Sequence, residues 1–416
     1  MTHNPSQKPT DHQPRPALWL ALLGVFFVGL NLRAAITSVA FVLPQIRSDL
    51  ALGTTAAGLL TTVPLLAFVC FSMQVPRWGR RFGMARLILF AMILLAVGFA
   101  IRLIPNAAVL FIGMAVVGLS IAIGNVLLPA YIKARYPDRA GPLMGVYTVA
   151  LYLGPALAAA GTLPIVRATG SWQIALLSWG VLLVGAIPLW LPQVLGSART
   201  LPGTAVKSGQ APLKLWGSPL AWSVTIYFAV LSVLFYTVNG WLPTMLQDRG
   251  NSAELGASVL TVVNFVAIPF ALVVSMLVAR TRSQVWATVS GSVLLGAGLA
   301  GIFFAPASTW VWWAICFGIG HGTATGVGFS LAMLRTRTVQ GTAALGAMSQ
   351  TAGYALSAVG PVGAGALREL SGNWDAVIWV ILSIVLAQTL AGLYAGRALF
   401  VDDMKLIKGS VDRARA

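Results

Sequence analysis

The sequence predicts an all-α membrane protein in which twelve transmembrane helices form two six-helix pseudo-repeats. Three observations predict this fold class. Only 9% of the 416 residues are charged and 58% are hydrophobic, whereas an ordinary soluble domain is about 25% charged. Many apolar runs exceed the roughly 20 residues with which a helix crosses a bilayer, and the alternating segments of a membrane barrel are absent. The two halves of the chain also resemble each other at a nearly constant offset.

The apolar runs place the spans in chain order. The polar, proline-rich start "MTHNPSQKPTDHQPRP" predicts a disordered tail over residues 1–16. The run after it is too long for a signal-peptide core and lacks a small-residue cleavage site, so we expect an uncleaved first helix. The twelve predicted spans are 17–43, 54–75, 86–104, 108–132, 142–165, 172–194, 219–244, 254–278, 285–305, 309–333, 342–367 and 374–397.

Most connections between the spans are short. The longest, over 195–218, contains "GSARTLPGTAVKSGQAP", which is rich in Gly, Pro and Ser and is typical of a linker. We therefore expect an N-terminal six-helix bundle over 17–194, a linker over 195–218, a C-terminal six-helix bundle over 219–397 and a tail over 398–416.

The net charge of +17 is explained by topology. The side that holds both termini carries 21 of the 27 Lys and Arg residues, the opposite side carries five, and Arg33 lies inside the membrane. This asymmetry predicts that both termini, the linker and the tail are cytoplasmic. The basic charge therefore does not indicate a nucleic-acid partner. Cys70 and Cys316 both fall in apolar runs and form no disulfide framework.

The internal repeat is visible in short matched segments. "VLPQI" at 42–46 corresponds to "WLPTM" at 241–245, and "TGSW" at 169–172 to "SGNW" at 371–374. Gly154-Pro155 corresponds to Gly360-Pro361, and Arg135 to Arg335. The shared order of these pairs indicates two parallel copies of one six-helix unit.

Six plus six helices in parallel repeat resemble the major facilitator transporters, whose substrates bind between the halves near the midplane. The loop "PRWGRRFGMAR" at 76–86 is similar to that superfamily's helix 2–3 motif, although Arg80 stands where an acidic residue is usual. "GPLMGVYTVALYLGPALAA" at 141–159 resembles its antiporter motif, with Ala150, Ala158 and Ala159 in place of glycines. The resemblance implies gating or structural roles for six residues: Arg81, Gly83, Gly154, Pro155, Gly360 and Pro361.

The stretch "GLNLRAAITSVAFVLPQIRSDL" at 29–50 narrows the resemblance to the cyanate permease and 2-nitroimidazole transporter branch. The resemblance to that branch implies a multi-pass protein of the bacterial inner membrane, for which we expect a monomer. It does not select a substrate within the branch.

Helical periodicity indicates which side chains face the space between the halves. Gly29, Arg33, Thr37 and Ala40 share a small, polar face of the first span. Similar faces occur on the other spans that line the cavity in the fold this chain resembles. The predicted substrate-binding residues are Arg33, Thr37, Asn125, Tyr147, Tyr236, Asn239, His321, Gln350 and Tyr354.

Arg33 and His321 are predicted to be the only ionisable groups of the membrane core apart from tyrosines and cysteines. All ten Asp and Glu residues lie in tails, loops or span ends. A buried cation without a carboxylate must find another anion, so we expect the substrate to be that anion or a strong hydrogen-bond acceptor. A proton carried by His321 is one candidate for coupling, since imidazole titrates near neutral pH; facilitated diffusion and substrate exchange are the others.

Several alternatives remain. Arg33 could be structural, His321 could be an ordinary interior histidine, and Asn125 and Asn239 could join helices by hydrogen bonds. The antiporter motif favours a second transporter function, efflux of drugs or nitroheterocycles. A channel or a non-transporting receptor is less compatible with a midplane belt of polarity and short loops. The sequence shows no catalytic constellation, metal cluster or nucleotide-binding loop, so we expect neither an enzyme nor a cofactor.

Overall fold

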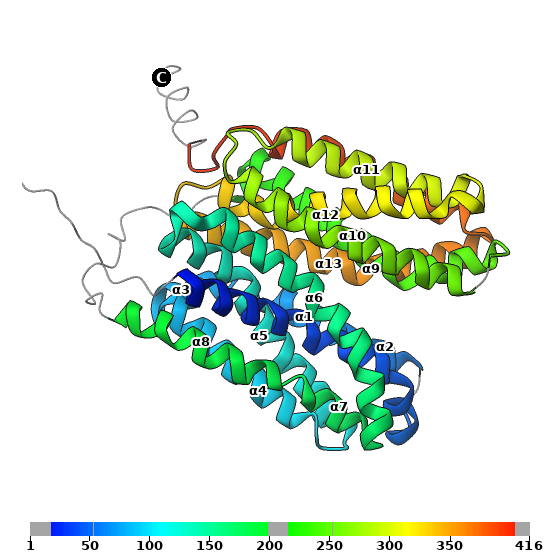
Figure 1. Cartoon of the computed structure of the whole chain (residues 1–416), viewed down its shortest axis with the longest axis horizontal. Coiled ribbons are helices and arrows are strands. Elements are labelled where there is room, and N and C mark those ends of the chain that lie inside the picture. The colour runs from blue at the N-terminus through cyan, green and yellow to red at the C-terminus, as the bar shows by residue number, and fades with distance from the viewer. Residues whose placement is uncertain (1–17, 53, 199–214, 252, 404–416) are drawn as a thin grey trace, which may run out of the picture.

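The computed structural model describes residues 18–198 and 215–403, except residues 53 and 252. Helices dominate this part of the chain, and they form two bundles (Figure 1). The first bundle contains α1 (Leu18–Asp49), α2 (Thr54–Phe71), α3 (Val75–Phe82), α4 (Met84–Ile101), α5 (Ala107–Arg135), α6 (Ala140–Thr169), α7 (Trp172–Ser178) and α8 (Val181–Ala198). The second contains α9 (Pro219–Asp248), α10 (Ala253–Val278), α11 (Val285–Phe304), α12 (Trp310–Leu334), α13 (Val339–Ser371) and α14 (Asp375–Ala395).

The twelve predicted spans correspond to these helices with small differences. The helix that holds the first span runs on to Asp49, although its apolar part ends at Leu43. The sixth span is divided into α7 and α8 at a turn around Gly180, and the short α3 lies between the second and third spans. The predicted tail over 1–16, most of the linker and the end of the C-terminal tail lie outside the described residues.

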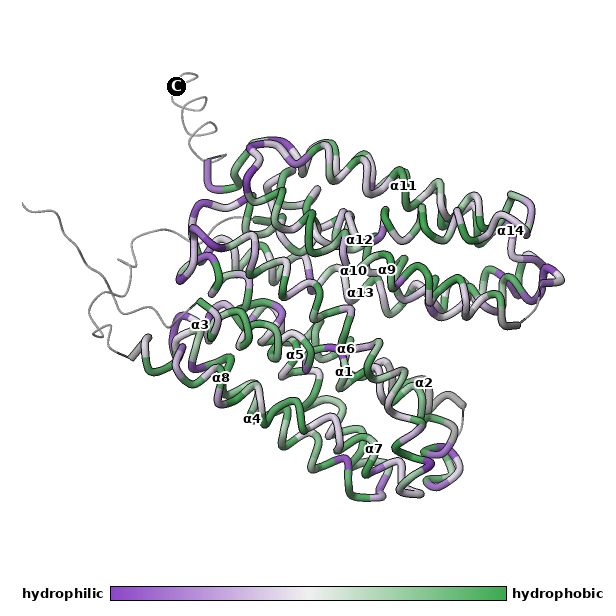
Figure 2. Tube along the Cα trace, viewed as in Figure 1, coloured by the Kyte–Doolittle hydropathy of each residue, from purple (hydrophilic) through white to green (hydrophobic). Residues whose placement is uncertain are grey.

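Nine segments of the described chain are long and apolar enough to cross a membrane by length and composition. The other three spans are α2, α12 and α13. Glycines and polar side chains lower the hydropathy of α12 and α13, and most of these residues are buried against other helices. Figure 2 shows the hydrophobic residues along the helices and most hydrophilic residues at their ends. This distribution is expected of helices that cross a bilayer.

The repeat recurs in the detailed structure of the helix ends. Gly170 ends α6 and Gly372 ends α13 in the left-handed backbone conformation, at φ 67° and 74°. Trp172 then donates its indole N–H to Asp49 at 2.7 Å, and Trp374 donates to Asp248 at the same distance. Each bundle therefore ties its first and last spans together on the side opposite the termini.

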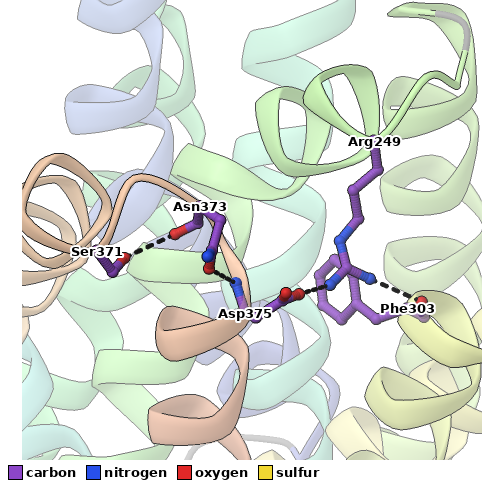
Figure 3. Close-up of polar contacts among 5 residues, drawn as sticks. All are labelled: Arg249, Phe303, Ser371, Asn373 and Asp375. Carbon is purple, nitrogen blue, oxygen red and sulfur yellow. Dashed lines mark hydrogen bonds and ion pairs between the residues drawn. The ribbon is translucent and has the colours of Figure 1, made fainter.

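The second bundle adds an ion pair to this arrangement (Figure 3). The guanidinium of Arg249 pairs with Asp375 and donates a second hydrogen bond to the carbonyl of Phe303 at 2.9 Å. Asn373 accepts from the backbone N–H of Asp375, and Ser371 donates to the carbonyl of Asn373, each at 2.9 Å. These contacts join the ends of α9, α11, α13 and α14.

The two bundles pack together on the side where α1 begins and diverge on the side where it ends (Figure 1). On the packed side, α6 lies against α10 and α2 against α13. A β-carbon on Gly145 of α6 would lie 2.8 Å from Leu272 of α10, so glycine permits this close approach. On the open side, Ala40 of α1 and Asn239 of α9 are exposed. The space between the bundles is therefore closed on the side of the termini.

Candidate binding site between the bundles

Arg33 lies in the middle of α1, where a glycine lets α6 approach closely. A β-carbon on Gly154 of α6 would lie 2.7 Å from the carbonyl oxygen of Leu30 and 3.5 Å from Cβ of Arg33. In the second bundle, a β-carbon on Gly360 would lie 2.7 Å from Thr237 of α9. The two glycine-proline pairs therefore sit at equivalent helix contacts. The family resemblance implied a gating or structural role for both glycine-proline pairs. In the structure the glycine of each pair lies at a close helix contact, Gly154 against α1 and Gly360 against α9.

The Arg33 side chain reaches across to the second bundle. Its Nη1 donates to the hydroxyl of Tyr236 at 3.2 Å, and its guanidinium carbon lies 5.5 Å from the ring centre of Phe235. Among the described residues, no carboxylate lies within ion-pair distance of Arg33. Arg33 is a half-buried residue, and Tyr236 is the one hydrogen-bond partner of its guanidinium among the described residues, although the planar fork carries several donors.

His321 of α12 also packs against Phe235. The two rings are stacked at 10° with their centres 6.0 Å apart. Tyr152 meets the imidazole edge-on at 5.7 Å, and Phe317 lies 5.9 Å away. The imidazole Nδ1 is buried and has no hydrogen-bond partner in the described part of the chain. Phe235 is thus a shared neighbour of a guanidinium and an imidazole, and aromatic rings form much of the wall around both.

A buried polar network lies on the termini side of Arg33. Tyr147 donates to the amide oxygen of Asn125 at 2.8 Å, and the Asn125 amide nitrogen donates to the hydroxyl of Tyr354 at 3.2 Å. Gln350 donates to the backbone carbonyl of Asn125 at 3.1 Å. All four side chains are at most 4% exposed. In this conformation they join α5 and α6 to α13 and are shielded from solvent.

Thr37 and Asn239 lie in the open half, farther from the termini than Arg33. Thr37 is one helical turn beyond Arg33 and is partly exposed. Asn239 is exposed and donates to the backbone carbonyl of Phe235 in its own helix at 2.8 Å. The nine predicted residues therefore divide into a central group with Arg33, Tyr236 and His321, an open half with Thr37 and Asn239, and a buried network.

The glycines of α12 pack within their own bundle. β-Carbons on Gly318 and Gly326 would lie 2.9 Å and 2.7 Å from backbone oxygens of α10. Gly320 is packed equally tightly against α11. These glycines therefore allow α12 to pack closely against both neighbours, with His321 on a remaining face.

The sequence-derived set missed three residues around this site. Phe235 and Phe317 look like ordinary packing residues in a membrane helix, and only their position beside His321 distinguishes them. Arg102, near the end of the predicted span 86–104, was expected among the five charges on the side opposite the termini, but its side chain is 0% exposed and enters the first bundle. The expectation that Arg33 and His321 are the only ionisable core groups was therefore wrong.

Arg81 is exposed in α3, and Gly83, at φ 86°, forms the turn into α4.

Comparisons with known proteins agree with this architecture. The family model described as Major Facilitator Superfamily matches residues 21–361. An uncharacterized transporter, YycB, of Bacillus subtilis is 33% identical over 94% of this chain and 97% of its own length. The 2-nitroimidazole transporter of Escherichia coli is 33% identical over 90% and 95%, and the cyanate transport protein CynX of the same species is 28% identical over 85% and 91%.

Solved structures share the fold at low sequence identity. The proton:xylose symporter XylE superposes with a TM-score of 0.74 at 13% identity, covering 94% of this chain and 98% of that one. FucP in an outward conformation superposes with a TM-score of 0.71 at 12% identity, covering 91% and 99%. These likenesses concern the arrangement of the helices.

Proposed function

This chain belongs to the Major Facilitator Superfamily, and from that membership we propose that it moves a small anion or a compact polar or aromatic solute, held at Arg33, across the bacterial inner membrane. The family is one of secondary transporters, not enzymes. In such transporters the substrate binds near the midplane between the bundles, and rocking of the bundles alternates access to it.

The observation that carries the proposal is the state of Arg33. Arg33 is a half-buried residue in the middle of a membrane helix, and its guanidinium has one neutral hydrogen-bond partner and no carboxylate among the described residues. A charge in this position is costly unless it is paired. An anionic or strongly accepting substrate supplies the missing partner, and the planar fork suits acceptors with two oxygen or nitrogen atoms.

The aromatic wall supports a compact, flat substrate. Phe235 and Tyr236 flank the guanidinium, and Phe235 and Tyr152 flank His321. The relatives named as 2-nitroimidazole and cyanate transporters point the same way, because a nitro group and cyanate both present small, electron-rich acceptors. Efflux of nitroheterocycles by antiport is therefore the second candidate function, and the tight packing of Gly154 against α1 is compatible with either direction of flux.

The charge distribution supports an orientation with both termini in the cytoplasm, because basic residues concentrate on that side. In this orientation the buried network and the packed side face the cytoplasm, and Thr37 and Asn239 face outward. The conformation described above is then an outward-open one, in which a solute reaches Arg33 from outside.

Flux measurements in proteoliposomes test the proposal. The panel contains cyanate, benzoate and 2-nitroimidazole, with benzamide as a neutral control that matches benzoate in shape. We expect the protein to exchange at least one anion or nitro compound across the membrane. Benzamide should inhibit that flux at least about tenfold more weakly than benzoate, which corresponds to a difference in binding free energy of about 1.4 kcal/mol. If benzoate and benzamide inhibit the flux of the transported compound equally, the site does not recognise negative charge. The direction of net flux under an imposed pH gradient then distinguishes uptake from efflux.

A further inference from the structure

Arg102 is a second buried arginine, and it lies in the interior of the first bundle. It follows the last residue of α4, yet its side chain turns inward and is 0% exposed. Nη1 donates to the backbone carbonyl of Ala35 in α1 at 2.9 Å, and the guanidinium carbon lies 4.6 Å from the ring centre of Phe99. Nε and Nη2 have no hydrogen-bond partner within the described residues.

The second copy of the repeat shows that packing alone does not require this charge. At an offset of 200 residues, Arg102 corresponds to Ile302 and Gly113 corresponds to Trp313. In the first bundle Gly113 leaves space for Arg102, since a β-carbon there would lie 2.8 Å from its Cγ. In the second bundle the indole of Trp313 packs against Gly301 instead. The same fold therefore fills the equivalent region with apolar groups.

A buried cation with unmade hydrogen bonds is destabilising compared with such an apolar filling. The presence of this charge therefore points to a role other than stability. The hydrogen bond from Arg102 to Ala35 indicates what this role is. The helix α1 packs mainly against α6 and α8, so Arg102 links it to a helix that is not one of its main neighbours. The long Arg102 side chain thus supplies a polar tie from the end of α4 to the middle of α1.

This tie is made two residues after Arg33. At 100° per residue, residues 33 and 35 lie about 200° apart around the helix, so Arg33 can face the second bundle while the Ala35 carbonyl faces the interior of the first. A hydrogen bond at Ala35 therefore fixes both the depth and the rotation of the turn that carries Arg33.

We propose that Arg102 is a positioning residue, which holds the central turn of α1 so that Arg33 faces the space between the bundles. The importance of this orientation for substrate rests on the proposed function of Arg33. The positioning itself does not, and it can be measured without a substrate.

The test uses cysteine labelling on α1, with Cys70 and Cys316 replaced. Ala40 is exposed and Val39 is 0% exposed, so a membrane-impermeant thiol reagent should label Ala40→Cys much faster than Val39→Cys. Three variants are compared in this background. Arg102→Leu resembles the apolar filling at Ile302, Arg102→Lys retains a charged donor, and Ile302→Leu is the matched control in the second bundle.

We expect Arg102→Leu to unfold at or above the temperature of the parent protein while the ratio of labelling at position 40 to that at 39 falls at least about threefold. Arg102→Lys should restore much of the ratio, and Ile302→Leu should leave it unchanged. Binding of cyanate or 2-nitroimidazole, where measurable, should weaken in parallel with the ratio. If the ratio of labelling at positions 40 and 39 is unchanged in Arg102→Leu, the proposal is overturned. It is also overturned if the ratio falls and the variant unfolds at a lower temperature than the parent protein, because Arg102 would then have a structural role. Failure of the Arg33 proposal would instead appear as normal substrate binding in Arg33→Ala with the labelling result intact.

Discussion

The guanidinium of Arg33 and the hydroxyl of Tyr236 lie 3.2 Å apart, although 203 positions separate them in the sequence. The bond joins α1 of the first bundle to α9 of the second at the centre of the molecule. Because alternating access moves one bundle against the other, a substrate held at this point contacts both moving parts. Tyr236 accepts one hydrogen bond from Arg33, and in the proposed function other donors of the guanidinium fork bind the substrate.

The first prediction concerns the charge and shape of Arg33. Arg33→Ala should weaken substrate binding at least about 30-fold, since losing a hydrogen-bonded charge partner typically costs about 2–5 kcal/mol. Arg33→Lys keeps the charge but loses the planar fork, so weak residual binding is expected. Equilibrium binding to purified protein measures both. Arg86→Ala, which removes an exposed arginine of α4, is the control, and normal affinity in Arg33→Ala would exclude Arg33 as the substrate ligand.

Sequence patterns could predict the helices and the central residues because both depend on local properties. Hydrophobic length identified the spans, and a charged residue on a small, polar helical face identified Arg33. Periodicity does not show whether an inward face is open or closed. The sequence therefore could not distinguish residues of the closed, buried network from residues of the open half. The buried network contains Asn125, Tyr147, Gln350 and Tyr354, and the open half contains Thr37 and Asn239.

Arg102 illustrates a different limit. An arginine near the end of an apolar span normally reaches toward water, so the sequence indicated a charge on the side opposite the termini. Its inward path depends on Gly113, a residue on another helix. Comparison of the two repeats could have revealed this relationship, because Gly113 stands where the other copy has Trp313.

The second prediction concerns access to the site. Asn239 is exposed in the open half, and Tyr236 of the central group is partly exposed. In a protein without Cys70 and Cys316, Asn239→Cys and Tyr236→Cys should react with a small thiol reagent applied from outside, and bound substrate should slow the reaction. Ser223→Cys, at a buried position near the start of α9, is the unreactive control. Absence of protection at both positions would indicate that the substrate binds elsewhere.

The third prediction concerns the contact that closes the termini side. Lys133 of α5 donates to the carbonyl of Met333 at 2.8 Å and also contacts the carbonyl of Thr336, at the end of α12 in the other bundle. These bonds must break for the termini side to open. Lys133→Met, which introduces the residue found at the repeat-equivalent position 333, should therefore favour the inward-open state.

Hydrogen bonds to charged groups contribute about 1.5–3 kcal/mol each. Loss of the Lys133 hydrogen bonds should therefore shift the equilibrium between the outward-open and inward-open states about tenfold or more. Labelling of Asn239→Cys from outside should fall, and labelling of Thr342→Cys from the cytoplasmic side should rise, since Thr342 is 1% exposed in the present conformation. Lys133→Arg should behave like the parent protein. If outside labelling is the same in Lys133→Met, these bonds do not determine which side is open.

The last prediction concerns energy coupling through His321. No Asp or Glu lies within the central parts of the spans, and arginine keeps its proton at any physiological pH. Imidazole, with an ordinary pKa of about 6.5, is the remaining group suited to exchange a proton. His321 and Arg33 both contact the same ring, Phe235, so an anion bound at Arg33 would favour a protonated imidazole, and its release would favour loss of that proton.

His321→Gln keeps a polar side chain of similar size but cannot carry the proton. We expect this variant to exchange substrate across proteoliposomes at a rate near that of the parent protein, yet to lose the ability to concentrate substrate when a pH gradient is imposed. Gln350→Asn, which shortens a polar side chain in the buried network, serves as the comparison because it should alter rates without abolishing the response to pH. Accumulation by His321→Gln equal to that of the parent protein would leave exchange or facilitated diffusion as the better account of transport.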